Sequence, residues 1–159
     1  MPARKPVYYW DSTIFIAWLQ DEKRKPGEME GVYELASEFE KKGIILVTAV
    51  TTLTEVLETR ITAQAAKTFE NFFERRNAIL MNTDARIATL ARSIRGYYDQ
   101  RGKNLTTPDC QHLASAIHFR VDEMHTFDED DLLPLNGNVA GYQLVICKPH
   151  TPQLRFDGF

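Results

Sequence analysis

Short apolar runs of strand length alternate along this 159-residue chain with stretches of helical spacing. The clearest run, IILVTA at residues 44–49, is apolar almost throughout, as is typical of a strand buried on both faces of a parallel sheet. The stretches around it carry apolar residues three and four positions apart, which predicts amphipathic helices. Strands that alternate with helices indicate an α/β domain. We therefore expect a three-layer helix–sheet–helix sandwich with a mainly parallel central sheet.

The same pattern places the individual elements. We expect strands at residues 7–10, 44–49, 79–81, 124–127 and 143–147, and helices around 14–18, 29–42, 53–57, 63–76, 84–100 and 107–120. Thr107 followed by Pro108 predicts a helix start, with the hydroxyl as the cap and proline at the first helical position. Residues 1–148 are expected to form one domain, followed by a tail at 149–159 that has no periodic pattern.

Composition narrows the class of protein. Hydrophobic residues make up 43% and charged residues 26%, as in an ordinary globular domain. No apolar run approaches the length that crosses a bilayer, and the first residues lack a signal-peptide pattern, so we expect a cytoplasmic protein without a membrane partner. Neither cysteine has metal-finger or CxxC spacing, which favours small buried hydrophobic roles for Cys110 and Cys147.

The net charge of −3 means that any affinity for nucleic acid must come from local basic patches. The best candidates for such a surface are Arg75, Arg76, Arg86, Arg92, Arg95, Arg101 and Lys103.

Four acidic residues stand at the ends of predicted strands or near the starts of predicted helices: Asp11, Glu55, Asp109 and Asp128. The carboxyl ends of parallel strands form sites at one edge of the sheet, especially where the strand order reverses, so these side chains can meet there. Converging carboxylates repel one another unless a cation joins them. A hard divalent cation such as Mg²⁺ best explains how such carboxylates could lie together, and Mg²⁺ held by carboxylates is typical of phosphate chemistry.

Each acid also has a simpler role open to it. Capping a helix would by itself explain Asp11, and the helix dipole favours an acid such as Asp109 in a first helical turn regardless of function. Glu55 can pair with a surface cation. The acidic turn offers Asp130 and Asp131 as well, which we expect to be solvated, and which acid joins Asp128 stays open.

Taken in order, these segments resemble the PIN domain, a family of metal-dependent nucleases that includes VapC-like toxins of bacterial toxin–antitoxin pairs. The resemblance covers roughly residues 7–147. It rests on the strand that ends in Asp11-Ser12, the turn TAVTTLTEVLE with Glu55, the helix start TPDCQHLASAI with Asp109, and the late turn Thr126-Phe127-Asp128.

The resemblance implies a site for Mg²⁺ or Mn²⁺ and the cleavage of single-stranded or structured RNA. The implied metal ligands and catalytic residues are Asp11, Glu55, Asp109 and Asp128, with the Ser12 and Thr126 hydroxyls orienting them. It also implies a homodimer and, for a toxin, a cognate antitoxin as partner. One departure is Cys110-Gln111-His112, where the family often has alanine after the third aspartate; we assign His112 no metal role.

Two other classes of function compete with a nuclease. A PIN-like domain that has lost catalysis would serve as an RNA- or protein-binding scaffold, although the presence of all four acids counts against it. A phosphotransfer domain of the receiver or haloacid-dehalogenase type also places aspartates at strand ends. The first strand ends in WDST, without the paired acids of those domains.

Overall fold

In the computed structural model, which describes residues 4–151, five parallel strands form a single sheet. Their order across the sheet is β3-β2-β1-β4-β5. The strands are β1 (Val7–Trp10), β2 (Ile45–Ala49), β3 (Ala78–Met81), β4 (Glu123–His125) and β5 (Ile146–Cys147).

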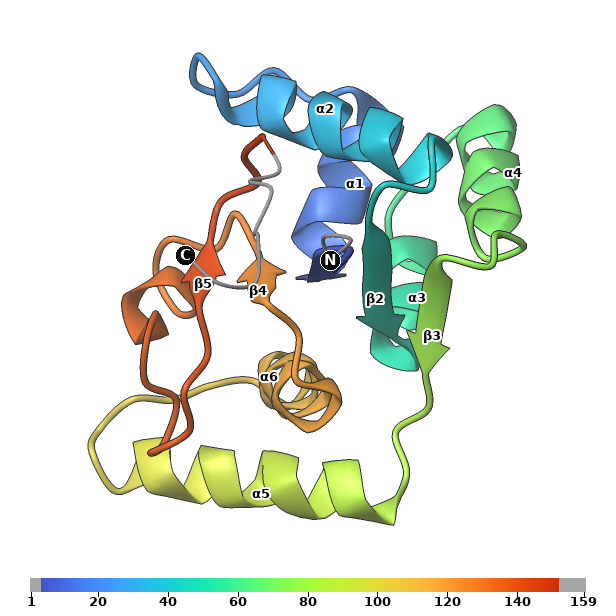
Figure 1. Ribbon diagram of the computed structural model, residues 1–159. Helices are drawn as coiled ribbons and strands as arrows, with labels where there is room; N and C mark the ends of the chain where they lie inside the picture. Colours follow the sequence, from blue (N-terminus) through green and yellow to red (C-terminus); the bar gives the residue numbers. More distant parts are fainter. Residues whose placement is uncertain (1–3, 152–159) are drawn as a thin grey trace.

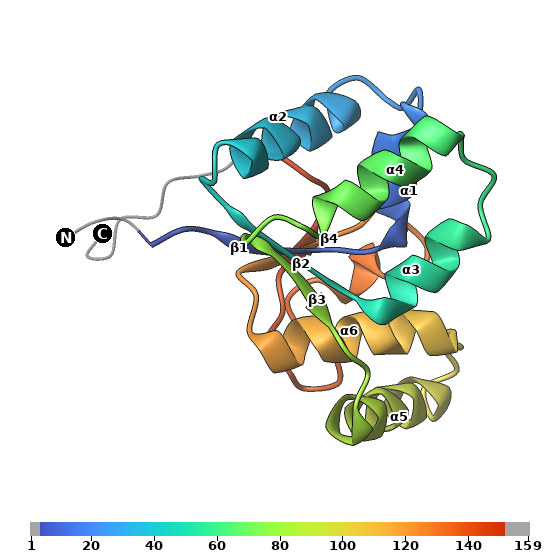
Figure 2. The same cartoon turned by 90° about the vertical axis from the view of Figure 1, so that its right-hand side faces the viewer.

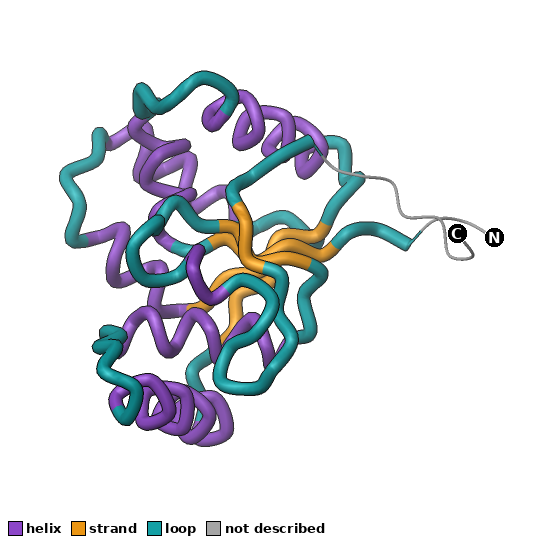
Figure 3. The backbone as a smooth tube through the Cα atoms, turned by 90° about the vertical axis from the view of Figure 1, so that its left-hand side faces the viewer, coloured by secondary structure: helices purple, strands orange, loops and turns teal. Residues whose placement is uncertain are grey.

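Helices cover both faces of this sheet (Figures 1 and 2). One face carries α1 (Ser12–Gln20), α2 (Glu28–Glu40) and α4 (Ala63–Phe72), and the other carries α5 (Ala85–Asp99) and α6 (Thr107–Phe119). A short helix, α3 (Val50–Leu57), follows β2 directly, and the 3-10 helix η1 (Leu133–Leu135) follows β4. Figure 3 shows the strands enclosed between the helical layers. The expected three-layer sandwich is confirmed.

Alternation along the first strand divides the core in two. Successive side chains of a strand point to opposite faces, so Tyr8 and Trp10 pack with α1, α2 and α4, while Tyr9 packs with α5 and α6. The rings of Phe15, Phe69 and Phe72 fill the first of these cores. Phe69 and Phe72 are therefore core residues and do not form an exposed surface on which RNA bases could stack.

The strand order positions the site. The chain moves outward from β1 to β2 and β3, and then returns to place β4 on the other side of β1. The order therefore reverses between β1 and β4, which pair in register with Trp10 opposite His125. In open parallel sheets, ligands bind in the crevice at such a reversal.

Several element boundaries differ from the prediction. The hydroxyl that caps α6 belongs to Thr106, which accepts the N–H of Asp109 at 3.2 Å, so Thr107 and Pro108 are already helical. The last strand begins only at Ile146: residues 139–142 form a turn with an antiparallel bridge between Val139 and Tyr142, and residues 143–145 belong to no strand.

None of the described helices combines the length and apolar character needed to cross a membrane. Of the predicted tail, residues 149–151 are described and 152–159 lie outside the described residues.

Candidate active site

Asp11 follows β1 and lies buried at the start of α1. Its Oδ1 caps the helix by accepting the N–H groups of Thr13 and Ile14 at 3.0 and 3.4 Å. Its Oδ2 accepts the hydroxyl of Thr126 at 2.5 Å. Burial raises the pKa of Asp11, although the nearby His112 and the hydrogen bonds oppose that shift. The carboxylate is thus more than a cap, because one oxygen is committed to the neighbouring strand's end.

Thr126 joins two of the predicted acids. Its Oγ1 donates to Asp11 and accepts the backbone N–H of Asp128 at 3.0 Å. Asp128 Oδ1 in turn accepts the N–H groups of Asp130 and Asp131 at 3.1 and 2.9 Å. These bonds hold the acidic turn after β4 against the start of α1.

Three carboxylates meet at this turn. Asp109, Asp128 and Asp131 each offer an oxygen, and these oxygens lie within 4.8 Å of one another. Burial raises the pKa of Asp109, and the charges of Asp128 and Asp131 add to that effect against an opposing hydrogen bond from Thr106. The acid that joins Asp128 is therefore Asp131, while Asp130 stays exposed. Converging oxygens of this kind suit a hard cation.

Glu55 reaches the site through a histidine. Its Oε1 lies 2.5 Å from His112 Nε2, and Nδ1 of the same ring lies 2.6 Å from the hydroxyl of the buried Tyr9. A carboxylate only accepts, so His112 Nε2–H donates to Glu55, and in a neutral ring Nδ1 accepts the Tyr9 O–H. Glu55 is thus held toward α6, outside the group of three carboxylates.

Of the two hydroxyls expected to orient ligands, Thr126 bonds to Asp11, as described above. Ser12 is buried at the first position of α1. The second hydroxyl on Asp11 comes instead from Thr13, whose Oγ1 donates to Oδ1 at 2.5 Å and accepts the N–H of Phe127 at 3.0 Å.

A groove of about 740 Å³ opens beside Asp128. One wall is the loop between α1 and α2, with Lys23, Arg24 and Lys25, and the other is the turn that begins at Phe127. The guanidinium of Arg24 lies 3.9 Å from the centre of the Phe127 ring, a cation–π contact. The groove is lined by both signs of charge, because Glu22, Glu28, Glu129 and Asp130 line it as well. Arg24 and Lys25 pair with Glu22 and Glu129 at 3.2 and 3.6 Å.

Some of the predicted basic residues also lie near the three carboxylates. Arg95 donates to the Thr107 hydroxyl at 2.9 Å, and Lys103 lies 3.4 Å from the carbonyl oxygen of Asp130. Arg75, by contrast, pairs with Glu40 at 2.5 Å.

Sequence reasoning missed Tyr9 and the basic loop at residues 23–25. Tyr9 reads as an ordinary strand aromatic, and the loop as a solvated linker. No local signal in the sequence points to either of them, since Tyr9 meets His112 only through the packing of α6 on β1.

A family model described as the PIN domain matches residues 8–133 of the chain. A comparison with curated proteins gives no match.

Solved structures of similar fold are numerous, with 26 matching chains. A chain of VapBC2 from Rickettsia felis, solved with a promoter DNA fragment, has 13% identity and a TM-score of 0.64, covering 88% of this chain and 96% of that one. A chain of FitAcB from Neisseria gonorrhoeae has 14% identity and a TM-score of 0.62, covering 89% and 97%. VapC20 from Mycobacterium tuberculosis, a toxin that cleaves the sarcin–ricin loop, has 13% identity and a TM-score of 0.57, covering 77% and 91%.

Proposed function

Because the chain belongs to the PIN domain family, as the sequence resemblance predicted, we propose that it is a metal-dependent endoribonuclease. PIN domains are nucleases, and the observation that carries the proposal here is the meeting of Asp109, Asp128 and Asp131 at the carboxyl edge of the sheet. Asp128 and Asp131 belong to one turn, and Asp109 joins them from the start of α6, so three like charges meet where a cation would relieve their repulsion.

The proposed ligands of Mg²⁺ or Mn²⁺ are Asp11, Asp109 and Asp128, with Glu55 completing the set and Asp131 as an additional acid. The residues fit a hard cation, because they offer only oxygen atoms, and because burial raises the pKa of both Asp11 and Asp109 where a positive charge would restore the ionised form. When bound, such a cation lowers the pKa of a water molecule and polarises the scissile phosphate.

The chain's own residues position the reaction. Thr126 holds Asp11 and the Asp128 turn in a fixed relation, through bonds of 2.5 and 3.0 Å. His112 holds the carboxylate of Glu55, which would either complete the metal's ligands or orient the attacking water. The basic loop at residues 23–25 borders the groove and is suited to bind RNA phosphates, adding affinity that weakens with salt.

We further propose that the protein is the toxin of a toxin–antitoxin pair, that it acts in the cytoplasm, and that it forms a homodimer. This part is supported by the similarity in fold to chains from VapBC and FitAB complexes. A cognate antitoxin would then block the acidic centre formed by Asp109, Asp128 and Asp131.

Cleavage assays test the enzymatic part. The purified chain is incubated with single-stranded RNA, and with a structured loop of the kind that VapC20 cleaves, in EDTA, Mg²⁺ or Mn²⁺. We expect cleavage only with metal and a loss of about 100-fold or more in Asp109→Asn, since the loss of groups that merely support metal ligands costs about 10–100-fold. Asp122→Asn is the matched control, because that carboxylate accepts the N–H of Val7 at the opposite end of the sheet.

Three results would count against the proposal. Equal cleavage by wild type and Asp109→Asn contradicts the site. Wild-type protein that binds RNA but stays inert with either metal favours the scaffold alternative. For the toxin assignment, induced expression should arrest growth with the wild type and not with Asp109→Asn, and a gene for a small DNA-binding protein should lie beside this one; normal growth under wild-type expression contradicts it.

A further inference from the structure

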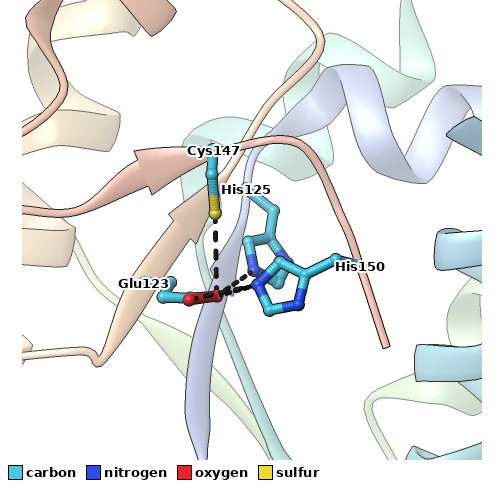
Figure 4. A group of neighbouring side chains, drawn as sticks. All are labelled: Glu123, His125, Cys147 and His150. Carbon is cyan, nitrogen blue, oxygen red and sulfur yellow. Dashed lines mark hydrogen bonds and ion pairs between the residues drawn. The ribbon is translucent and has the colours of Figure 1, made fainter. Parts of the chain in front are cut away.

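A second group of potential metal ligands lies on the face of the sheet that α1 and α2 cover. It consists of Glu123 and His125 from β4, Cys147 from β5 and His150 from the segment that follows (Figure 4). Residues 123 and 125 point to the same face because strand side chains alternate, and Cys147 pairs in register with His125. In Figure 4 the four side chains point toward one another.

The ligand atoms of the four groups lie within 4.8 Å of one another, close enough to gather around one ion. Glu123 Oε1 lies 3.1 Å from His125 Nε2, 3.6 Å from Cys147 Sγ and 2.6 Å from His150 Nε2. Tetrahedral zinc with bonds of about 2.0–2.3 Å places neighbouring ligand atoms about 3.3–3.7 Å apart. The distance from Glu123 to Cys147 already suits such a shell, and His150 Nε2 would move away from Glu123 by about 0.7 Å to join it. The glutamate and His125 are buried, so water screens this group poorly.

The tautomer of His150 argues for a cation between the ligands. Its Nδ1 lies 2.8 Å from the carbonyl oxygen of Thr151, which only accepts, so Nδ1 carries a hydrogen. In the neutral ring, Nε2 then presents a lone pair to both oxygens of Glu123, at 2.6 and 3.1 Å. Two acceptors at this distance need a positive charge between them: a second proton on His150 or a metal ion. A second proton on His150 would leave the Cys147 thiol donating to Glu123 Oε1 at 3.6 Å, whereas a metal ion would bind the sulfur as a thiolate ligand.

We propose that Glu123, Cys147 and His150 bind Zn²⁺ or a cation of similar softness, at a site separate from the acidic centre. Thiolate and imidazole ligands select zinc over Mg²⁺, which prefers oxygen. Three protein ligands leave the fourth position to solvent, which reaches the half-buried His150.

His125 takes a different part from the other three. The indole N–H of Trp10 lies 3.2 Å from His125 Nδ1 and donates to it, so the neutral ring carries its hydrogen on Nε2 and donates to Glu123. A nitrogen that carries a hydrogen has no lone pair for a metal. His125 is therefore a positioning residue that orients the glutamate ligand.

The site joins the segment after β5 to the body of the domain. That segment lies against α2, where a Cβ at Gly31 would overlap the carbonyl of Pro149. Lys148 Nζ lies 3.4 Å from Glu28, and the Thr151 hydroxyl donates to Glu34. A cation held by Glu123, Cys147 and His150 would join this segment to β4 and β5.

Metal titration of the full-length chain, freed of metal with a chelator, tests this site. With Co²⁺ as the probe we expect one equivalent to give a thiolate-to-cobalt absorption band, and Zn²⁺ to displace it. The band should persist in 5 mM Mg²⁺, and in an Asp11→Asn/Asp109→Asn variant that lacks the acidic centre. Failure of the nuclease proposal would therefore leave this result untouched.

Variants assign the ligands. Cys147→Ser should abolish the band, whereas Cys110→Ala, at the chain's other cysteine, should keep it. His150→Gln should weaken Zn²⁺ binding at least about 10-fold. Zinc should also raise the melting temperature of the wild type but not of Cys147→Ser, with circular dichroism reporting that each variant is folded. Absence of a thiolate band in the wild type, or equal zinc affinity in wild type, Cys147→Ser and His150→Gln, overturns the proposal.

Discussion

Replacing Asp11 by asparagine separates a metal ligand from a mere helix cap. The carboxylate accepts three bonds on Oδ1, from the N–H groups of Thr13 and Ile14 and from the Thr13 hydroxyl, and one on Oδ2, from Thr126. Asparagine keeps Oδ1 as the cap, and its amide can donate to the Thr126 hydroxyl. It also removes a charge that is costly to bury, since burial raises the pKa of Asp11. We therefore expect the free energy of unfolding, measured in EDTA, to change by no more than about 1 kcal/mol.

Alanine at the same position removes all four bonds. The lost cap costs about 0.5–2 kcal/mol, and the buried Thr126 hydroxyl, left without its acceptor, adds about 1–3 kcal/mol. The sum of about 1.5–5 kcal/mol corresponds to a melting temperature lower by roughly 3–20 °C for a chain of this size. Denaturant unfolding and thermal melts in EDTA measure both variants.

Cleavage of RNA completes the test. Both variants should lose about 100-fold or more in metal-dependent cleavage although only the alanine variant is destabilised. Asp84→Asn is the matched control, because Asp84 also caps a helix, accepting the N–H of Ile87 at 3.0 Å, but is exposed. If Asp11→Asn cleaves RNA at the wild-type rate, Asp11 is a helix cap alone and the assignment of the metal site to this residue is wrong.

Two further predictions concern the support of Glu55 and the aromatic core. Tyr9→Phe removes the hydroxyl that lies 2.6 Å from His112, the residue that holds Glu55. We expect kcat at saturating RNA to fall about 10–100-fold while the chain stays folded. An unchanged kcat would show that Glu55 needs no such support. Phe72→Ala opens a cavity beside Phe39, because the two rings are stacked with their centres 4.5 Å apart. The free energy of unfolding, measured with denaturant, should fall by about 3–5 kcal/mol, with cleavage per folded molecule unchanged. A loss below about 1 kcal/mol would contradict the tight packing of this core.

The local pattern of the chain was sufficient for the architecture. Apolar runs such as 44–49 and the spacing of helices such as α5 report burial that each segment carries in its own sequence, and the three-layer sandwich followed from their alternation. The local pattern predicted the ends of the helices and strands less accurately. The hydroxyls of Thr106 and Thr107 are chemically equivalent as helix caps, and only the folded backbone selects Thr106.

Which of the candidate site residues lie close together could be read only from the fold. The sequence places Asp11 and Asp128 after strands, but the strand order decides that β1 and β4 are neighbours, and so lets Thr126 join them. The choice of Asp131 over Asp130 follows from the geometry of the turn around Asp128, to which no local signal points.

The sequence by itself therefore determined the class of fold and the family resemblance, because hydrophobic periodicity and short motifs are local properties, and it proposed the four acids as candidates. Only the tertiary structure decided which groups meet: Glu55 with His112 and Tyr9, and Glu123 with Cys147 and His150. Such contacts join residues far apart in the chain, and a parallel sheet sets their distances through its strand order and register, which no single segment encodes.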